Sequence, residues 1–177
     1  LADLKTNGVD VSAVRRTDKH PTSAVIGLIE SSGERSFLCR PGANEQLTAE
    51  VIPDSLFEGV GIVHIGGAMK LVNLDLASVL RRAGEAGCTT TLDTDWDARG
   101  VWIEPLRPAL PYVRTLMTNE LEGRMLTGEQ SAEAIGRALL EYGPQVVVVK
   151  QGAHGSMVVT RQHSVQVPAF RVNVVDT

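Results

Sequence analysis

The chain has 177 residues, of which 43% are hydrophobic and 21% are charged, and its formal net charge is -4. This composition is typical of one globular domain or most of a larger one. The small negative charge gives no electrostatic basis for binding nucleic acid or an anionic membrane. The longest apolar runs are much shorter than the roughly 20 residues that span a bilayer, so we expect a cytoplasmic protein. The two cysteines lie far apart, at Cys39 and Cys88, and indicate neither a disulfide framework nor a zinc site.

Two apolar runs near the start of the chain, 24–30 and 36–40, are separated by the polar sequence Ser-Ser-Gly-Glu. This pattern predicts a β-hairpin. Both faces of the first strand are apolar, which leaves two interpretations open. One face could cover a ligand and the other a partner, or the strand could be buried in a core on both sides. Taken alone, the residues favour the core strand.

From residue 59 onward, the pattern changes to alternating strands and helices. Apolar residues at helical spacing predict one helix over 72–83 and another that carries Ile135, Ala138, Leu139 and Tyr142, with a short helix starting at Asn119. The nearly continuous valines of 145–150 are typical of a parallel strand that is covered on both faces. Further strands are expected at 61–65, 88–92, 113–117, 156–160 and 164–167, the last two as an antiparallel pair.

These elements predict an α/β fold, with an open and mostly parallel sheet flanked by helices and a small β lid before it. Ligands bind to such sheets at the carboxyl ends of the strands. The sequence contains no GxxxxGK[ST], no complete GxGxxG and no GxSxG. A P-loop NTPase, a Rossmann dehydrogenase and an α/β-type serine hydrolase therefore have no support.

Three segments in fixed order carry residues suited to phosphate chemistry: Asn119 to Glu122, Lys150 to Gly155, and the terminal Asp176-Thr177. Each segment also has a simpler interpretation. Asn119 and Glu122 could only cap a helix, the two glycines at 152 and 155 could only form a turn, and the terminal pair could simply be solvated. Because the segments occur together and in this order, we favour a phosphate-handling site.

The order of these motifs resembles the ribokinase family of carbohydrate kinases, also called the PfkB family. The resemblance covers nearly the whole chain, and the further segments that carry it are Gly8-Val9-Asp10, Pro41-Gly42-Ala43-Asn44, 63–67 and 92–95. It implies an incomplete ribokinase-like domain formed by 1–20 and 41–177, with 21–40 as its lid. Because the sequence begins at Leu1 and stops directly after an apolar run, we interpret it as a portion of a longer protein, missing residues on both sides.

The resemblance implies roles for the three segments. Asn119 and Glu122 match the family's NxxE motif, whose carboxylate helps to hold Mg²⁺ through water. The segment after the valine strand would border the phosphates and ribose of ATP, through Lys150, Gly152 and Gly155. Asp176 matches the start of the DTxGAGD motif and would contribute to a monovalent cation site, with K⁺ as the candidate ion. The general base is the last aspartate of that motif and is expected beyond Thr177.

The resemblance also suggests residues that contact the sugar. Two of these residues, Asp93 and Asp95, come from the sequence Asp-Thr-Asp at the end of a strand, which could alternatively be a strand-end cap. Gly66 stands where other members place a sugar-contacting side chain, and a glycine cannot make that contact. The complete set is Val25, Gly27 and Cys39 in the lid, with Gly66, Asp93 and Asp95 in the larger domain.

The function implied is transfer of the γ-phosphoryl group of ATP to a hydroxyl of a sugar or sugar derivative. A nucleoside kinase of the same fold and a non-catalytic sugar- or nucleotide-binding relative are the alternatives. Without the GAGD segment, this chain alone is expected to be inactive. The apolar outer lid face, formed by Ala24, Ile26 and Leu28, suggests a homodimer.

Overall fold

The computed structural model describes residues 1–31 and 35–172. The chain divides into two compact units, Leu1–Leu47 and Thr48–Thr177. Asp176, predicted for the cation site, and Thr177 lie outside the described residues. No helix in the described ranges combines the length and apolar character that crossing a bilayer requires.

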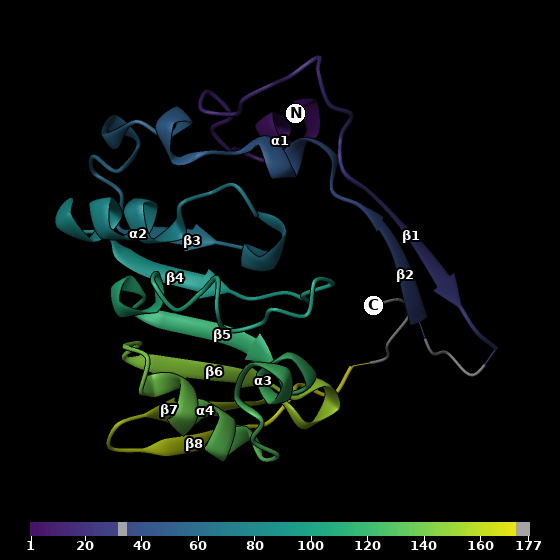
Figure 1. Ribbon diagram of the computed structural model, residues 1–177, viewed down its shortest axis with the longest axis vertical. Coiled ribbons are helices and arrows are strands. Elements are labelled where there is room, and N and C mark those ends of the chain that lie inside the picture. Colours follow the sequence, from purple (N-terminus) through teal and green to yellow (C-terminus); the bar gives the residue numbers. More distant parts are fainter. Residues whose placement is uncertain (32–34, 173–177) are drawn as a thin grey trace. The chain divides into compact units, whose positions relative to one another are not determined.

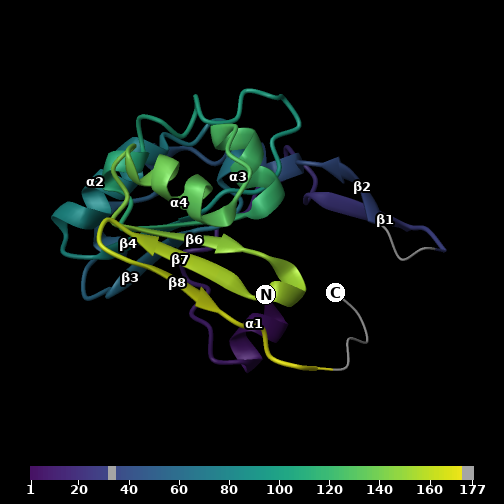
Figure 2. The same ribbon diagram turned by 90° about the horizontal axis from the view of Figure 1, so that it is seen from below.

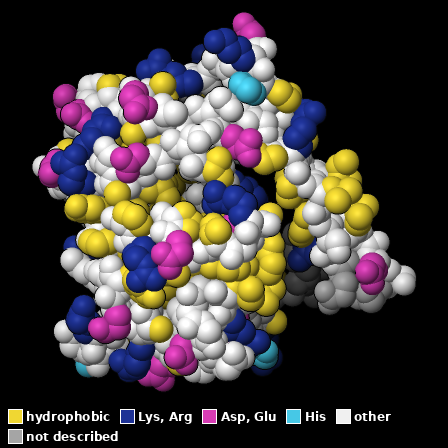
Figure 3. Space-filling model, viewed as in Figure 1, with side chains coloured by type: hydrophobic (Ala, Val, Ile, Leu, Met, Phe, Trp, Pro, Cys, Tyr) yellow, Lys and Arg dark blue, Asp and Glu magenta, His cyan; other side chains and the backbone are white. Residues whose placement is uncertain are grey.

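The first unit contains a short helix, α1 (Ala2–Thr6), and the predicted hairpin of β1 (Ala24–Ile29) and β2 (Arg35–Arg40). The strands pair antiparallel, with Val25 opposite Cys39 and Gly27 opposite Phe37. Every residue of both strands is exposed, and hydrophobic side chains are visible along the hairpin in Figure 3. The prediction of a strand buried on both sides is therefore wrong, because a two-stranded hairpin cannot enclose a core of its own.

The second unit is built on a six-stranded sheet with the order β3-β4-β5-β6-β7-β8 (Figure 1). The first four strands run parallel, and β7 and β8 extend the sheet antiparallel. This arrangement confirms the predicted α/β class and the terminal antiparallel pair. The strands are β3 (Ile62–Ile65), β4 (Thr89–Asp93), β5 (Thr115–Asn119), β6 (Val146–Lys150), β7 (Ser156–Thr160) and β8 (Ser164–Val167).

Three helices, α2 (Leu76–Glu85), α3 (Glu120–Thr127) and α4 (Ala132–Leu140), lie on one face of this sheet (Figure 2). Successive parallel strands are added in one direction, and right-handed crossovers then place every connecting helix on the same side. Val147 and Val149 face these helices and are fully buried, whereas Val146 and Val148 are half-buried. The valine pattern predicted a strand covered on both faces. Within the described residues of this unit, helices cover only one face.

Capping residues predict where the helices start better than the spacing of apolar residues does. Asp75 accepts a hydrogen bond from the Ser78 amide at 2.9 Å, so α2 begins at Leu76. Val72, the first residue of the predicted helix, precedes that cap. Shorter 3-10 helices in the chain are η1 (Gly42–Gln46), η2 (Ala49–Val51), η3 (Asp54–Leu56), η4 (Ala68–Lys70), η5 (Leu110–Tyr112) and η6 (Gly152–His154).

Close packing places α3 and α4 against the sheet. A Cβ atom on Gly123 of α3 would lie 2.6 Å from Ile135 Cγ2, and one on Gly136 of α4 would collide with Val159 of β7. Side chains at these positions would push the helices apart, since interiors have almost no free volume. The two glycines therefore allow α3 to pack closely against α4, and α4 against β7.

Candidate functional site

The carboxyl ends of the four parallel strands meet at one edge of the sheet, which we call the carboxyl edge. Most predicted site residues lie there, because parallel strands deliver their last residues to the same edge. The three lid residues belong to the first unit, where the register places Val25, Gly27 and Cys39 on one face of the hairpin. The carboxyl edge carries Gly66 after β3, Asp93 and Asp95 at the end of β4, Asn119 and Glu122 at the junction of β5 and α3, and Lys150, Gly152 and Gly155 at the end of β6.

Asn119 and Glu122 form a capping box at the start of α3. The Glu122 amide donates to Asn119 Oδ1 at 2.8 Å, and the Asn119 amide donates to Glu122 Oε2 at 3.4 Å. Because Oδ1 of Asn119 already accepts the helix amide, its Nδ2 faces Glu122 Oε1 and donates to it at 2.7 Å. The capping interpretation is therefore confirmed, and it leaves a carboxylate fixed at the carboxyl edge with an exposed fraction of only 7%.

Two threonines complete the surroundings of this carboxylate, and the sequence analysis missed both. Thr94 Oγ1 donates to Glu122 Oε2 at 2.7 Å, and Thr118 Oγ1 lies 3.4 Å from the same oxygen. The two hydroxyl oxygens are 3.1 Å apart, and both side chains are fully buried. Threonine is common within strands, so only the position of Thr94 between two aspartates could have drawn attention to it.

Two Lys–Asp pairs lie at the same edge. Lys150 Nζ donates to both carboxylate oxygens of Asp93, at 2.8 and 2.7 Å, and Lys70 Nζ lies 2.6 Å from Asp95 Oδ2. The side chains keep exposed fractions between 29% and 46%, so these pairs contribute little to stability, roughly 0–1 kcal/mol each. Asp95 also accepts a hydrogen bond from the Trp96 amide and has a φ of 86°, in the left-handed region. Sequence reasoning found both aspartates and Lys150 but missed Lys70.

The loop after β6 contains two glycines with different surroundings. A Cβ on Gly155, which has a φ of +89°, would collide with the Val167 carbonyl oxygen, so the chain itself requires glycine there. Gly152 also has a left-handed φ, +55°, but nothing in the described chain lies within 4 Å of a Cβ at that position. Gln151 Oε1 between β6 and this loop is buried, and no described residue donates a hydrogen bond to it.

Asp97 anchors the loop that follows β4. Its Oδ2 accepts hydrogen bonds from the amides of Val101 and Trp102, both at 2.7 Å, and its Oδ1 accepts one from the Arg99 amide at 3.1 Å. Burial would raise the pKa of this carboxyl group, but the three amides and the Arg99 side chain outweigh burial and hold the pKa below its ordinary value. Asp97 is therefore a structural anion that shapes the chain beside the carboxyl edge.

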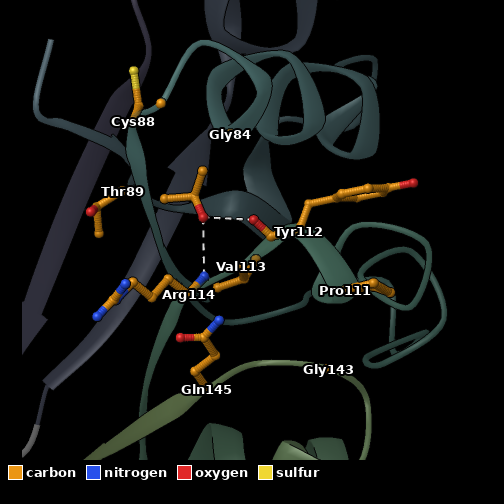
Figure 4. Close-up of a pocket in the computed structure, with 11 residues that line it drawn as sticks. Gly84, Cys88, Thr89, Pro111, Tyr112, Val113, Arg114, Gly143 and Gln145 are labelled. Atoms are coloured by element: carbon orange, nitrogen blue, oxygen red, sulfur yellow. Dashed lines mark hydrogen bonds between the residues drawn. The ribbon is translucent and has the colours of Figure 1, made fainter.

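A cavity of about 300 Å³ lies at the opposite, amino edge of the parallel strands (Figure 4). Its lining includes Cys88, Thr89, Arg114 and Gln145, near the starts of β4, β5 and β6. Ligands of open α/β sheets bind at the carboxyl ends, so the site is not assigned to this cavity. Among the described residues, no group of three or more His, Cys, Asp and Glu side chains could hold a metal ion by itself.

Comparison with known proteins identifies the family and supports the fold. The family model described as "pfkB family carbohydrate kinase" matches residues 1–177. The chain belongs to the PfkB family. A solved structure with a similar fold is that of an E. coli protein assigned as a ribokinase II, in complex with ATP and Mg²⁺. It is 20% identical with a TM-score of 0.81, and the match covers 99% of this chain and 59% of that one.

Two curated relatives of this PfkB-family chain are more similar in sequence. An ATP-dependent ribose-1-phosphate kinase of Halopiger xanaduensis is 29% identical over 99% of the chain and 56% of the relative. A 2-dehydro-3-deoxygluconokinase of Bacillus subtilis is 26% identical over 100% of the chain and 59% of the relative. The chain thus spans somewhat more than half the length of these relatives.

Proposed function

We propose that the protein is an ATP-dependent carbohydrate kinase, which transfers the γ-phosphoryl group of ATP to a hydroxyl of a sugar or sugar derivative. The observation that carries this proposal is the fixed Glu122 carboxylate at the carboxyl edge of a PfkB-family sheet. Phosphoryl transfer depends mainly on positioning and on neutralising charge. A rigid carboxylate at the same edge as an open glycine loop can position a cation, and the cation can neutralise the phosphates.

The donor set fits Mg²⁺, which prefers oxygen ligands and binds through one or two carboxylates together with substrate phosphates. Glu122 Oε1 accepts one short hydrogen bond, from Asn119, which leaves it further acceptor capacity. We propose that Glu122 holds the ion through water and that Asn119 orients the carboxylate. When bound, Mg²⁺ supplies positive charge that neutralises the phosphates.

For ATP, we propose Lys150, Gly152 and Gly155 as neighbours of the phosphates and ribose. Gly152 supports this role most directly, because its left-handed backbone faces open space where a ligand could approach the main chain. Gly155 holds the loop in shape by its contact with the chain after β8. Lys150 places an exposed ammonium group at the end of β6, where it can attract an anionic ligand.

For the sugar, we propose Asp93 and Asp95 at the carboxyl edge, with Gly66 leaving space rather than making a contact. Carboxylates at this position can accept hydrogen bonds from sugar hydroxyls. The ion pair between Asp93 and Lys150 brings a residue proposed for the sugar beside one proposed for ATP, which suits transfer between adjacent sites. From the first unit, we propose that the lid face with Val25, Gly27 and Cys39 covers the substrate.

Two further parts of the proposal concern a monovalent cation and the oligomeric state. Asp176 is proposed for a monovalent cation site, with K⁺ as the candidate. A homodimer through Ala24, Ile26 and Leu28 would bury exposed apolar side chains, and a monomeric mass of the full-length protein in solution would contradict it.

The test is ADP formation by the full-length protein over a panel of pentoses, hexoses, keto-deoxy acids and nucleosides. The proposal predicts activity with at least one sugar or sugar derivative. Activity with nucleosides alone would support the nucleoside kinase alternative. Ligand binding without any ADP formation would support the non-catalytic alternative, which the fold by itself does not exclude.

A further inference from the structure

We infer that Thr94 and Thr118 are positioning residues that fix the Glu122 carboxylate in the single orientation in which it can act on a metal ion. This inference deepens the magnesium role proposed above for Glu122 and depends on it. The observation is the hydroxyl pair at the ends of β4 and β5: both side chains are fully buried, and both lie within hydrogen-bonding distance of Glu122 Oε2.

The protons available define a short chain of hydrogen bonds. Each hydroxyl has one proton, and the Thr94 proton goes to Glu122 Oε2, which is charged and only 2.7 Å away. Thr94 Oγ1 can then accept the proton of Thr118, 3.1 Å away. Oε2 is thereby committed to the protein interior, and Oε1 is the oxygen left with capacity for an outside donor.

The backbone of Thr94 makes this arrangement rigid. Its amide donates to the Met117 carbonyl of β5 at 3.1 Å, and its carbonyl accepts the Met69 amide of η4 at 3.2 Å. Thr94 is thus held between η4, which follows β3, and strand β5. The capping box holds Oε2 only by a long contact, 3.4 Å from the Asn119 amide, so the short bond from Thr94 restricts the carboxylate further.

Hydrogen bonds that orient a metal-binding side chain typically matter 10- to 100-fold for metal affinity or activity. Replacing Thr94 by valine keeps the shape of the side chain but removes the hydroxyl. Glu122 would keep its place in α3 through the capping box but would lose its short contact on Oε2. We therefore expect weaker metal binding from Thr94→Val, and a smaller effect from Thr118→Val because Thr118 acts on Oε2 only through Thr94.

The experiment measures Mn²⁺ binding to the full-length protein with a non-hydrolysable ATP analogue, by electron paramagnetic resonance of free Mn²⁺. Thr94→Val should raise the Mn²⁺ dissociation constant about 10-fold, and Thr94→Ser, which keeps the hydroxyl, should stay close to wild type. The matched control is Thr90→Val in β4, the strand that Thr94 directly follows. Thr90 is 4% exposed, and the change removes a hydrogen bond to the Tyr112 carbonyl at the amino edge. It should leave Mn²⁺ binding unchanged.

A double mutant separates orientation from general damage. In a Glu122→Gln background, Thr94→Val should change Mn²⁺ binding by less than about twofold, because the carboxylate that Thr94 orients is absent. The inference is overturned if the wild type binds no Mn²⁺, if Thr94→Val binds like wild type, if Thr90→Val weakens binding equally, or if the loss persists in the Glu122→Gln background. Failure of the kinase proposal would be seen separately, as absence of sugar phosphorylation by a wild type that binds Mn²⁺.

Discussion

Replacement of Glu122 by glutamine separates a structural carboxylate from a functional one. The glutamine carbonyl can keep the contact with Asn119 Nδ2, and its NH2 group can donate to Thr94 Oγ1, whose proton then turns to Thr118. The two short hydrogen bonds are preserved, but they lose charge assistance. The Asn119 amide also loses its acceptor at 3.4 Å, and the helix start loses a favourable charge worth about 0.3–1 kcal/mol. Relief from burying a charge acts in the opposite direction.

We therefore expect Glu122→Gln to change the free energy of unfolding by only about 1 kcal/mol, measured by urea denaturation. In contrast, kcat/KM should fall about 100-fold, equivalent to roughly 2.7 kcal/mol, and the half-saturating Mg²⁺ concentration should rise about 10-fold. The control is Glu133→Gln, which removes a half-exposed carboxylate from the first turn of α4. If Glu122→Gln and Glu133→Gln show the same activity and Mg²⁺ dependence, the reasoning about Glu122 is refuted.

Three further predictions concern stability. Asp97→Asn should lower the free energy of unfolding by about 2 kcal/mol at neutral pH. Because the folded pKa is lowered, the contribution of the carboxylate is present above the unfolded pKa of about 3.9 and is lost as pH falls through the folded value. The difference from wild type should thus shrink in denaturation below about pH 4, and a constant difference would contradict this. Gly155→Ala should lower the free energy of unfolding more than Gly152→Ala, because only the first change causes a collision. Gly152→Ala should cost about 1–2 kcal/mol, for its left-handed backbone alone, and the reverse order would contradict the contacts described. Gly136→Ala should destabilise by about 1–3 kcal/mol through overpacking, whereas Gly84→Ala, on an open helix surface, should raise the melting temperature, and two equal shifts would count against the packing argument.

Local sequence signals predicted elements well where a single strand or helix determined the outcome. The valine strand and the NxxE helix start could be predicted because strand patterning and capping depend on neighbouring residues. That no described helix covers the second side of the valine strand could not be predicted, since this follows from the order in which all the strands join the sheet. The exposure of the hairpin likewise depends on what packs against it rather than on its own apolar residues.

The site shows the same division. Asn119, Glu122 and Lys150 lie in recognisable motifs, but their partners come from distant parts of the chain. Asp93 and Lys150 are 57 positions apart, and Thr94 reaches Glu122 across 28 positions. Such contacts appear only once β4, β5 and β6 are aligned side by side. Lys70, which lies in a short helix after β3, had no signal in the sequence at all.

The most direct test of the proposed function is transfer of a label from the γ-phosphoryl group of ATP to a sugar by the full-length protein. The account predicts a labelled sugar product that requires Mg²⁺, disappears on chelation and is strongly reduced in Glu122→Gln. A folded protein that labels none of the sugars or sugar derivatives in the panel, or labels them equally well without a divalent metal, would contradict it.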